Sequence, residues 1–146
     1  MKELEIYIDG ASKGNPGPSG IGAVICHAGT VVKNLSSFIG NATNNIAEYS
    51  ALIYALQEAS VLKAESLKIK TDSELLARQL NKTYKVKSAN ICGLYNQAVI
   101  LISTFKKVSI QSIPREENQG ADKLATEAVE RELRKPACRQ AGKVLL

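Results

Sequence analysis

Paired cysteines and long apolar runs are missing from this sequence. Its three cysteines are widely spaced and include no Cys-x-x-Cys pair, which argues against a disulfide framework and against a structural zinc site. We interpret two of them, Cys26 and Cys92, as small core residues. No apolar run approaches the roughly 18 residues of a membrane span, and the first residues do not have the pattern of a signal peptide. We therefore expect a cytoplasmic protein that does not associate with a membrane.

The chain has 146 residues, of which 45% are hydrophobic and 23% are charged. This length suits one domain, and the composition excludes a disordered chain. The charge is uneven: residues 1–81 hold 7 basic and 8 acidic side chains (net −1), whereas residues 82–146 hold 12 and 6 (net +6). A basic half favours a polyanionic partner, with nucleic acid first, although lysines and arginines that only solubilise surface helices would give the same balance.

Alternation of apolar and polar residues predicts strands, and apolar residues at three- and four-residue steps predict helices. The predicted strands cover residues 4–9, 21–26, 30–39, 67–72 and 108–113. The predicted helices cover residues 46–59, 75–80, 91–105 and 120–134. Residues 10–20 are rich in glycine and proline, so we expect no regular structure there.

This order of elements predicts an α/β fold with a five-stranded mixed sheet flanked by helices, in which the first and fourth strands are neighbours in the middle of the sheet. We expect one domain over residues 1–135. The apolar period is lost after Pro136, so residues 136–146 are predicted to form a loosely ordered tail.

Most acidic residues lie on predicted outer faces, but four do not. Asp9 and Asp72 each end a predicted central strand, and Glu48 and Asp122 are predicted in the first turns of two helices. The helix dipole stabilises an acid in a first turn, which explains Glu48 or Asp122 taken singly. Four converging carboxylates would repel one another unless divalent cations neutralised them, and oxygen ligands favour Mg²⁺ or Mn²⁺. Two such ions about 4 Å apart serve in-line phosphodiester displacement.

The four acids lie in four ordered motifs. These are residues 7–17 (Tyr-Ile-Asp-Gly-Ala-Ser-Lys-Gly-Asn-Pro-Gly), 43–48 (Thr-Asn-Asn-Ile-Ala-Glu), 71–73 (Thr-Asp-Ser) and 118–125 (Asn-Gln-Gly-Ala-Asp-Lys-Leu-Ala). With them, the sequence closely resembles ribonuclease H type 1 over residues 4–134. The resemblance implies the strand order 3-2-1-4-5 for the sheet and a catalytic domain over residues 1–135. The resemblance implies an endonuclease that cuts the RNA strand of RNA/DNA hybrids with two Mg²⁺ ions, for which Mn²⁺ can substitute, and leaves 5′-phosphate and 3′-hydroxyl ends. It implies as metal ligands Asp9, Glu48, Asp72 and Asp122.

The resemblance also implies a substrate surface. Minor-groove and backbone contacts are implied for Gly10, Ser12, Asn15, Asn44 and Asn45. Asparagine can donate to and accept from a 2′-hydroxyl, which RNA carries and DNA lacks. In some relatives, the positions of Thr43 and Ser88 hold a phosphate of the DNA strand. Structural alternatives remain open, because Asn15 suits an ordinary turn and both Asn44 and Ser88 suit helix capping.

The sequence departs from several relatives at two places. Its one histidine, His27, lies in a predicted hairpin turn, whereas those relatives have a histidine in the loop before the last carboxylate. Here that loop contains Arg115, which stays protonated and cannot act as a general base, but can contact a phosphate. Residues 82–87 are too short for the basic protrusion of larger relatives, so their lysines would act as an electrostatic patch. These departures resemble a histidine-lacking, protrusion-lacking branch of the family.

Two alternatives keep the fold and change the function: a hybrid-binding module without cleavage, and a resolvase-like nuclease that acts on DNA. The presence of all four acids disfavours the module, and 146 residues leave no room for the extra DNA-binding domains of transposases. A phosphate-loop nucleotide hydrolase is excluded because the motif Gly-x-x-x-x-Gly-Lys-Ser/Thr is absent. We expect an RNA/DNA hybrid as the partner, and a free-standing protein that needs no obligate protein partner.

Overall fold

The computed structural model describes residues 2–82 and 84–135. In chain order its elements are β1 (Glu3–Ser12), β2 (Gly17–His27), β3 (Thr30–Ala42), α1 (Asn44–Val61), β4 (Ser66–Thr71), α2 (Glu74–Leu80), α3 (Ala89–Ile102), β5 (Lys107–Ser112), the 3₁₀ turn η1 (Arg115–Glu117) and α4 (Gln119–Leu133). No helix of this part has both the length and the apolar content that crossing a membrane requires. The predicted tail over residues 136–146 lies outside the described residues.

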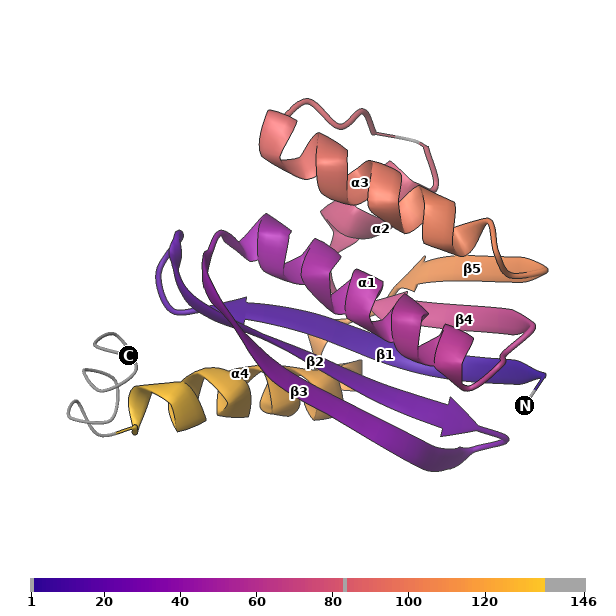
Figure 1. The fold of residues 1–146 in the computed structure, drawn as a ribbon, viewed down its shortest axis with the longest axis horizontal. Coiled ribbons are helices and arrows are strands. Elements are labelled where there is room, and N and C mark those ends of the chain that lie inside the picture. Colours follow the sequence, from indigo (N-terminus) through magenta and orange to yellow (C-terminus); the bar gives the residue numbers. More distant parts are fainter. Residues whose placement is uncertain (1, 83, 136–146) are drawn as a thin grey trace, which may run out of the picture.

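The strands form one mixed sheet in the order β3-β2-β1-β4-β5, which confirms the predicted fold (Figure 1). β1 pairs antiparallel with β2 and parallel with β4. β2 pairs antiparallel with β3, and β4 pairs parallel with β5. The last residue pair between β1 and β4 joins Ile8 to Thr71, so Asp9 and Asp72 are the next residues on two neighbouring central strands.

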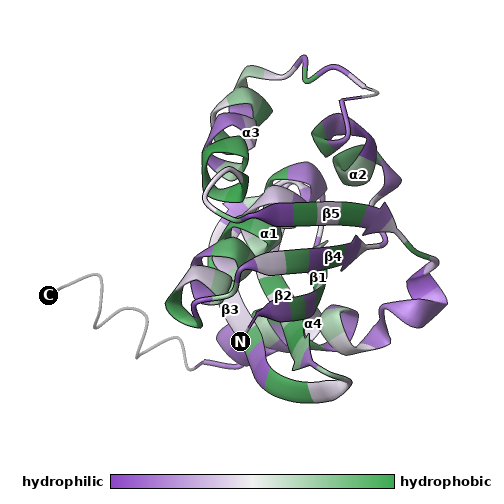
Figure 2. Ribbon diagram, turned by 90° about the vertical axis from the view of Figure 1, so that its right-hand side faces the viewer, coloured by the Kyte–Doolittle hydropathy of each residue, from purple (hydrophilic) through white to green (hydrophobic). Residues whose placement is uncertain are grey.

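Helices cover both faces of this sheet: α1 and α3 lie on one side and α4 lies on the other (Figure 1). Leu4, Ile6 and Ile8 alternate along β1 and are fully buried, and the same alternation of hydropathy is visible along β5 (Figure 2). Burying a side chain of this kind contributes about 1.5–3 kcal/mol relative to leaving it exposed. A hydrogen bond of 2.7 Å from the Tyr49 hydroxyl to Gln79 Oε1 then joins α1 to α2. The core therefore holds α1, and with it Glu48, in a fixed position on the sheet.

The prediction that residues 10–20 have no regular structure was wrong except for residues 13–16, which connect the two strands. β1 continues to Ser12 and β2 begins at Gly17, and the ladder between them includes the pair Ser12 and Ser19. Ser19 is fully buried, and its hydroxyl is 3.0 Å from the Ser12 hydroxyl and 3.1 Å from the carbonyl oxygen of Ala42. Glycine is tolerated in these strands because the ladder satisfies the hydrogen-bonding groups of the main chain. The missing side chains also allow the helices to pack closely on the strands.

Two smaller predictions were also wrong. The helix predicted to reach Phe105 ends at Ile102, and Phe105 follows in a turn, half-buried against the core. Cys92 is exposed on α3 and Cys26 is half-buried, so neither is a fully buried core residue. Cys92 directly follows the buried Ile91, and neighbouring positions on a helix face different directions.

Candidate active site

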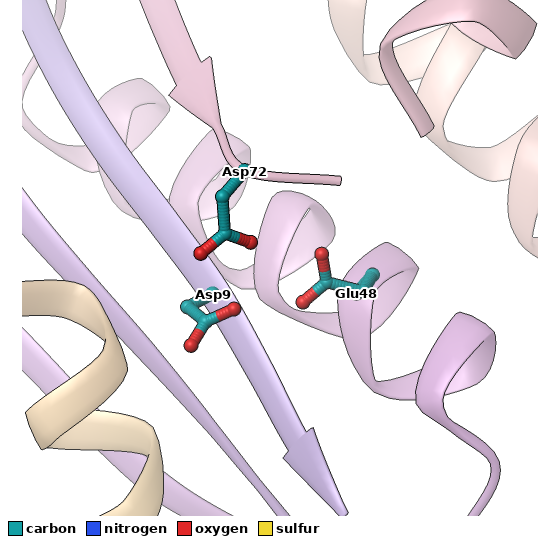
Figure 3. A group of neighbouring side chains, drawn as sticks. All are labelled: Asp9, Glu48 and Asp72. Carbon is teal, nitrogen blue, oxygen red and sulfur yellow. The ribbon is translucent and has the colours of Figure 1, made fainter. Parts of the chain in front are cut away.

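Asp9, Glu48 and Asp72 come together at the centre of the sheet. Asp9 lies within β1 rather than at its end, Glu48 lies on α1, and Asp72 directly follows β4. The three carboxylate groups each offer an oxygen, and these oxygens all lie within 4.8 Å of one another. The side chains point toward one shared space (Figure 3). Three residues from separate elements therefore form a carboxylate cluster of the kind that can hold a cation.

Glu48 reaches this cluster through a contact that its sequence position does not reveal. It is the fifth residue of α1, beyond the predicted first turn, so the helix dipole does not account for it. Its Oε1 instead accepts a hydrogen bond from the main-chain N–H of Gly10. A Cβ at Gly10 would overlap the main chain of Ala47 and Glu48. Glycine at this position thus allows α1 to approach β1 and brings Glu48 beside Asp9.

Burial and crowding disfavour the ionised form of these acids. Asp9 is 6% exposed, and its pKa is raised chiefly by this burial and further by the charges of Glu48 and Asp72. The pKa of Glu48 is also raised, again chiefly by burial, although the Gly10 amide favours its charged form. A divalent cation would relieve both effects, and clustered carboxylate oxygens fit Mg²⁺ or Mn²⁺.

Asp122 joins the site from the opposite face of the sheet. It lies in the first turn of α4, as predicted, and its side chain is close enough to Asp9 to contribute to the raised pKa of that acid. Its Oδ1 also lies 3.8 Å from a guanidinium nitrogen of Arg115. Asp122 is outside the compact three-residue cluster, but all four acids line one cavity of about 580 Å³. The fold therefore brings the four acids that the sequence singled out to one place.

Several of the predicted substrate residues surround this cavity. Its lining includes Gly10, Ser12, Asn44, Asn45 and Arg115. Two of them are already used by the fold: the Gly10 amide donates to Glu48, and the Ser12 hydroxyl donates to the carbonyl oxygen of Ala42 at 2.9 Å. A contact from either group to a substrate would compete with these bonds. Their roles as substrate contacts stay predictions.

The other three predicted residues lie outside the lining of the cavity. Asn15 is next to it, because its Oδ1 accepts a hydrogen bond of 3.0 Å from the N–H of Asn44. Thr43 caps α1, since its hydroxyl oxygen accepts from the N–H of Ile46 at 3.3 Å. Ser88 precedes α3 as its N-cap residue but makes no side-chain capping bond. Helix capping therefore explains Thr43 and leaves the hydroxyl of Ser88 without that role.

Two residues of the site were not singled out from the sequence, although both lie in its motifs. Lys13 and Ser73 line the cavity with the four acids. The Ser73 side chain lies near Glu48 and acts to lower the pKa of that acid, and its hydroxyl oxygen caps α2 by accepting from the N–H of Leu76 at 3.2 Å. Lys13 follows Ser12 at the end of β1 and is the lysine of the first motif. The position of Ser73 directly after Asp72 is the sequence feature that could have identified it as a residue of the site.

We expect Gly10→Ala to destabilise the protein by about 1–3 kcal/mol, because a new methyl group would push α1 away from β1. Gly93→Ala is the matched control: Gly93 lies within α3, and a Cβ there would meet no atom within 4 Å. Alanine in an open helical position should stabilise by roughly 0.5–1 kcal/mol. Urea denaturation would measure both free energies of unfolding. Equal effects of the two substitutions would contradict the close packing at Gly10.

Comparison with known sequences places the chain in a family. A family model described as reverse transcriptase-like matches residues 7–128. Bifunctional protein Rv2228c of Mycobacterium tuberculosis is 41% identical over 130 residues, which cover 88% of this chain and 36% of that protein. Ribonuclease HI of Halobacterium salinarum is 38% identical over 128 residues, which cover 87% of this chain and 64% of that protein. This chain thus spans little more than a third of the mycobacterial relative.

Comparison with solved structures agrees with this match. The N-terminal RNase H domain of the M. tuberculosis protein has a TM-score of 0.84 and 41% identity, covering 87% of this chain and 98% of that one. RNase H1 of H. salinarum has a TM-score of 0.86 and 37% identity, covering 88% and 98%. LC11-RNase H1, crystallised with an RNA/DNA hybrid, has a TM-score of 0.85 and 36% identity, covering 89% and 99%. Agreement in both sequence and fold over most of its length shows that the chain belongs to the ribonuclease H family, type 1.

Proposed function

We propose that this protein is an endonuclease that hydrolyses the RNA strand of RNA/DNA hybrids and leaves 5′-phosphate and 3′-hydroxyl ends. The observation that carries the proposal is the single cavity lined by Asp9, Glu48, Asp72 and Asp122 together with asparagine and arginine side chains. The relative from H. salinarum is named ribonuclease HI, and LC11-RNase H1 was crystallised with an RNA/DNA hybrid. Both support an RNA/DNA hybrid as the substrate of this chain.

The four acids would hold two Mg²⁺ ions, with Mn²⁺ as a substitute. Asp9 lies beside Glu48 and Asp72 and faces the same cavity as Asp122, so its carboxylate would be one of the groups that hold the ions. Such ions supply activation of water and stabilisation of the leaving oxygen in phosphodiester displacement. The chain contributes the fixed arrangement: the main-chain N–H of Gly10 holds Glu48, and the end of β4 holds Asp72.

Strand choice would come from the polar residues at the cavity rim. Asn44 and Asn45 begin α1, and Oδ1 of Asn15 accepts from the main-chain N–H of Asn44, so the three residues lie together at the start of α1. Amide groups can donate to and accept from consecutive 2′-hydroxyls, which mark the RNA strand. We assign Gly10 and Ser12 to the same groove, and we assign Thr43, Ser88 and Arg115 to phosphate contacts. Lysines near residues 82–87 would add sequence-independent attraction for the duplex.

The remaining assignments are part of the same proposal. Residues 1–135 would form the catalytic domain, which works in the cytoplasm without an obligate protein partner. The chain would act without a histidine in the loop before Asp122, where Arg115 lies 3.8 Å from the acid. Because a guanidinium does not release its proton, Arg115 would bind charge and not transfer protons.

The decisive experiment incubates the protein with Mg²⁺ and three end-labelled duplexes: RNA/DNA, DNA/DNA and RNA/RNA. We expect cutting of the RNA strand of the hybrid alone, because the asparagines would recognise 2′-hydroxyls on one strand of a mixed duplex. Poly(A) polymerase should extend the products, since it requires a 3′-hydroxyl end. Cutting of DNA/DNA would support the resolvase-like alternative instead. Binding of the hybrid without cutting in either Mg²⁺ or Mn²⁺ would support the non-cleaving module.

A further inference from the structure

Asn118 lies between η1 and α4 and makes contacts that the proposed chemistry does not use. The residue is 1% exposed, and its Nδ2 donates a hydrogen bond of 2.8 Å to the carbonyl oxygen of Ile8. Its Oδ1 is buried and has no hydrogen-bond partner among residues 2–82 and 84–135. A buried acceptor without a partner costs free energy. The orientation of the Asn118 side chain is therefore not the one that satisfies all of its own polar atoms.

Helix capping does not explain this orientation either. Asn118 is the N-cap residue of α4, yet its side chain makes no capping bond. An asparagine at this position ordinarily accepts a hydrogen bond from an N–H in the first turn of the helix. Here the main-chain carbonyl of Asn118 accepts from the N–H of Asp122 at 3.1 Å, while the side chain binds β1. One residue therefore holds the main chain of Asp122 and that of Ile8, which directly precedes Asp9.

Strand β2 gives the beginning of α4 a second fixed contact. Gly22 is paired with Asp9 across the β1–β2 ladder. A Cβ at Gly22 would overlap the carbonyl oxygen of Ala121 and lie 2.6 Å from the main-chain nitrogen of Ala125. The absence of a side chain at Gly22 thus lets the beginning of α4 lie close to the sheet, and the bond from Asn118 to Ile8 ties it to β1 there.

We infer that Asn118 is a positioning residue, whose bond to Ile8 sets the separation between the carboxylates of Asp122 and Asp9. The inference rests on the proposed function, in which both acids would hold metal ions. The Oδ1 atom is then unpaired because the side chain binds β1 instead of capping α4. Groups that orient metal ligands typically change metal affinity or activity by about 10–100-fold when they are removed.

The test compares Asn118→Ala with Ser36→Ala by calorimetric titration with Mn²⁺ and by hybrid cleavage. Ser36 is a matched control because its hydroxyl donates to the carbonyl oxygen of Leu124 at 2.6 Å, which also ties α4 to a strand. We expect Asn118→Ala to weaken Mn²⁺ binding and lower kcat by roughly 10–100-fold, with the KM for the hybrid unchanged. Ser36→Ala should leave both the Mn²⁺ affinity and kcat at wild-type values.

Equal Mn²⁺ affinities of the two variants would overturn the inference, even where the wild-type protein cuts hybrids. A wild-type protein that binds Mn²⁺ but cuts no hybrid would overturn the proposed function, and the two affinities would still decide the inference. A wild-type protein that binds no Mn²⁺ would overturn both. Circular dichroism would show whether Asn118→Ala folds. If it does not, Asn118→Ser keeps a shorter donor: a partial loss of Mn²⁺ affinity would support the inference, and wild-type affinity would overturn it.

Discussion

We expect Asp9→Asn to lower the rate of hybrid cleavage by at least about 10³-fold, which corresponds to a loss of roughly 4 kcal/mol of transition-state stabilisation. The amide has nearly the size of the carboxyl group but cannot supply the carboxylate that would hold a metal ion beside the other acids. Single-turnover cleavage of a labelled RNA/DNA hybrid in Mg²⁺ and in Mn²⁺ would measure the effect. Because the change is nearly isosteric, the far-ultraviolet circular dichroism spectrum should stay the same.

Glu5→Gln provides the matched control for this loss of activity. Glu5 lies on the same strand and undergoes the same change from acid to amide, but it forms an ion pair of 2.9 Å with Lys70 away from the cavity. Its cleavage rate should stay within about twofold of the wild type, since surface ion pairs contribute little energy. If Asp9→Asn kept more than a tenth of the wild-type rate, Asp9 would not be one of the metal ligands.

The same Asp9→Asn substitution should stabilise the metal-free protein near neutral pH. Burial and neighbouring charges raise the pKa of Asp9 in the folded state, so the folded state retains a proton that the unfolded chain releases above about pH 4. The free energy of unfolding of the wild type therefore falls as the pH rises above this value. Asparagine removes that loss, and we expect Tm at pH 8 to rise by roughly 5 °C or more, since 1 kcal/mol corresponds to about 2–4 °C at this size.

Thermal melts in the presence of EDTA across pH 5–9 would measure this stabilisation, which should grow with pH. Glu5→Gln should have the opposite sign, because the hydrogen bond from Lys70 lowers the pKa of Glu5 and stabilises the folded state above the ordinary glutamate pKa. Added Mg²⁺ should raise the Tm of the wild type more than that of Asp9→Asn. A destabilised Asp9→Asn variant at every pH would contradict the repulsion inferred within the cluster.

Much of the fold could be predicted because its signals are local. Alternating residues such as Leu4, Ile6 and Ile8 specify a strand with one buried face, and the crossover rules then bring β1 next to β4. That adjacency places Asp9 and Asp72 together before any coordinates are known. The glycine-rich segment was misjudged because its pairing depends on partners outside the window, such as the carbonyl of Ala42 that binds Ser19.

The candidate site also combines features that could be predicted from the sequence with features that depend on distant partners. The chain order of Asp9, Glu48, Asp72 and Asp122 within four motifs, and the basic charge of the second half, could be read from the sequence alone. The bond from Gly10 to Glu48, the contact of Gly22 with Ala121 and the bond from Asn118 to Ile8 were decided by the tertiary structure. A residue pattern records which side chains share a face of one element. The distance between two elements depends on how closely their main chains pack, and that is settled when distant glycines and buried amides meet in the folded protein.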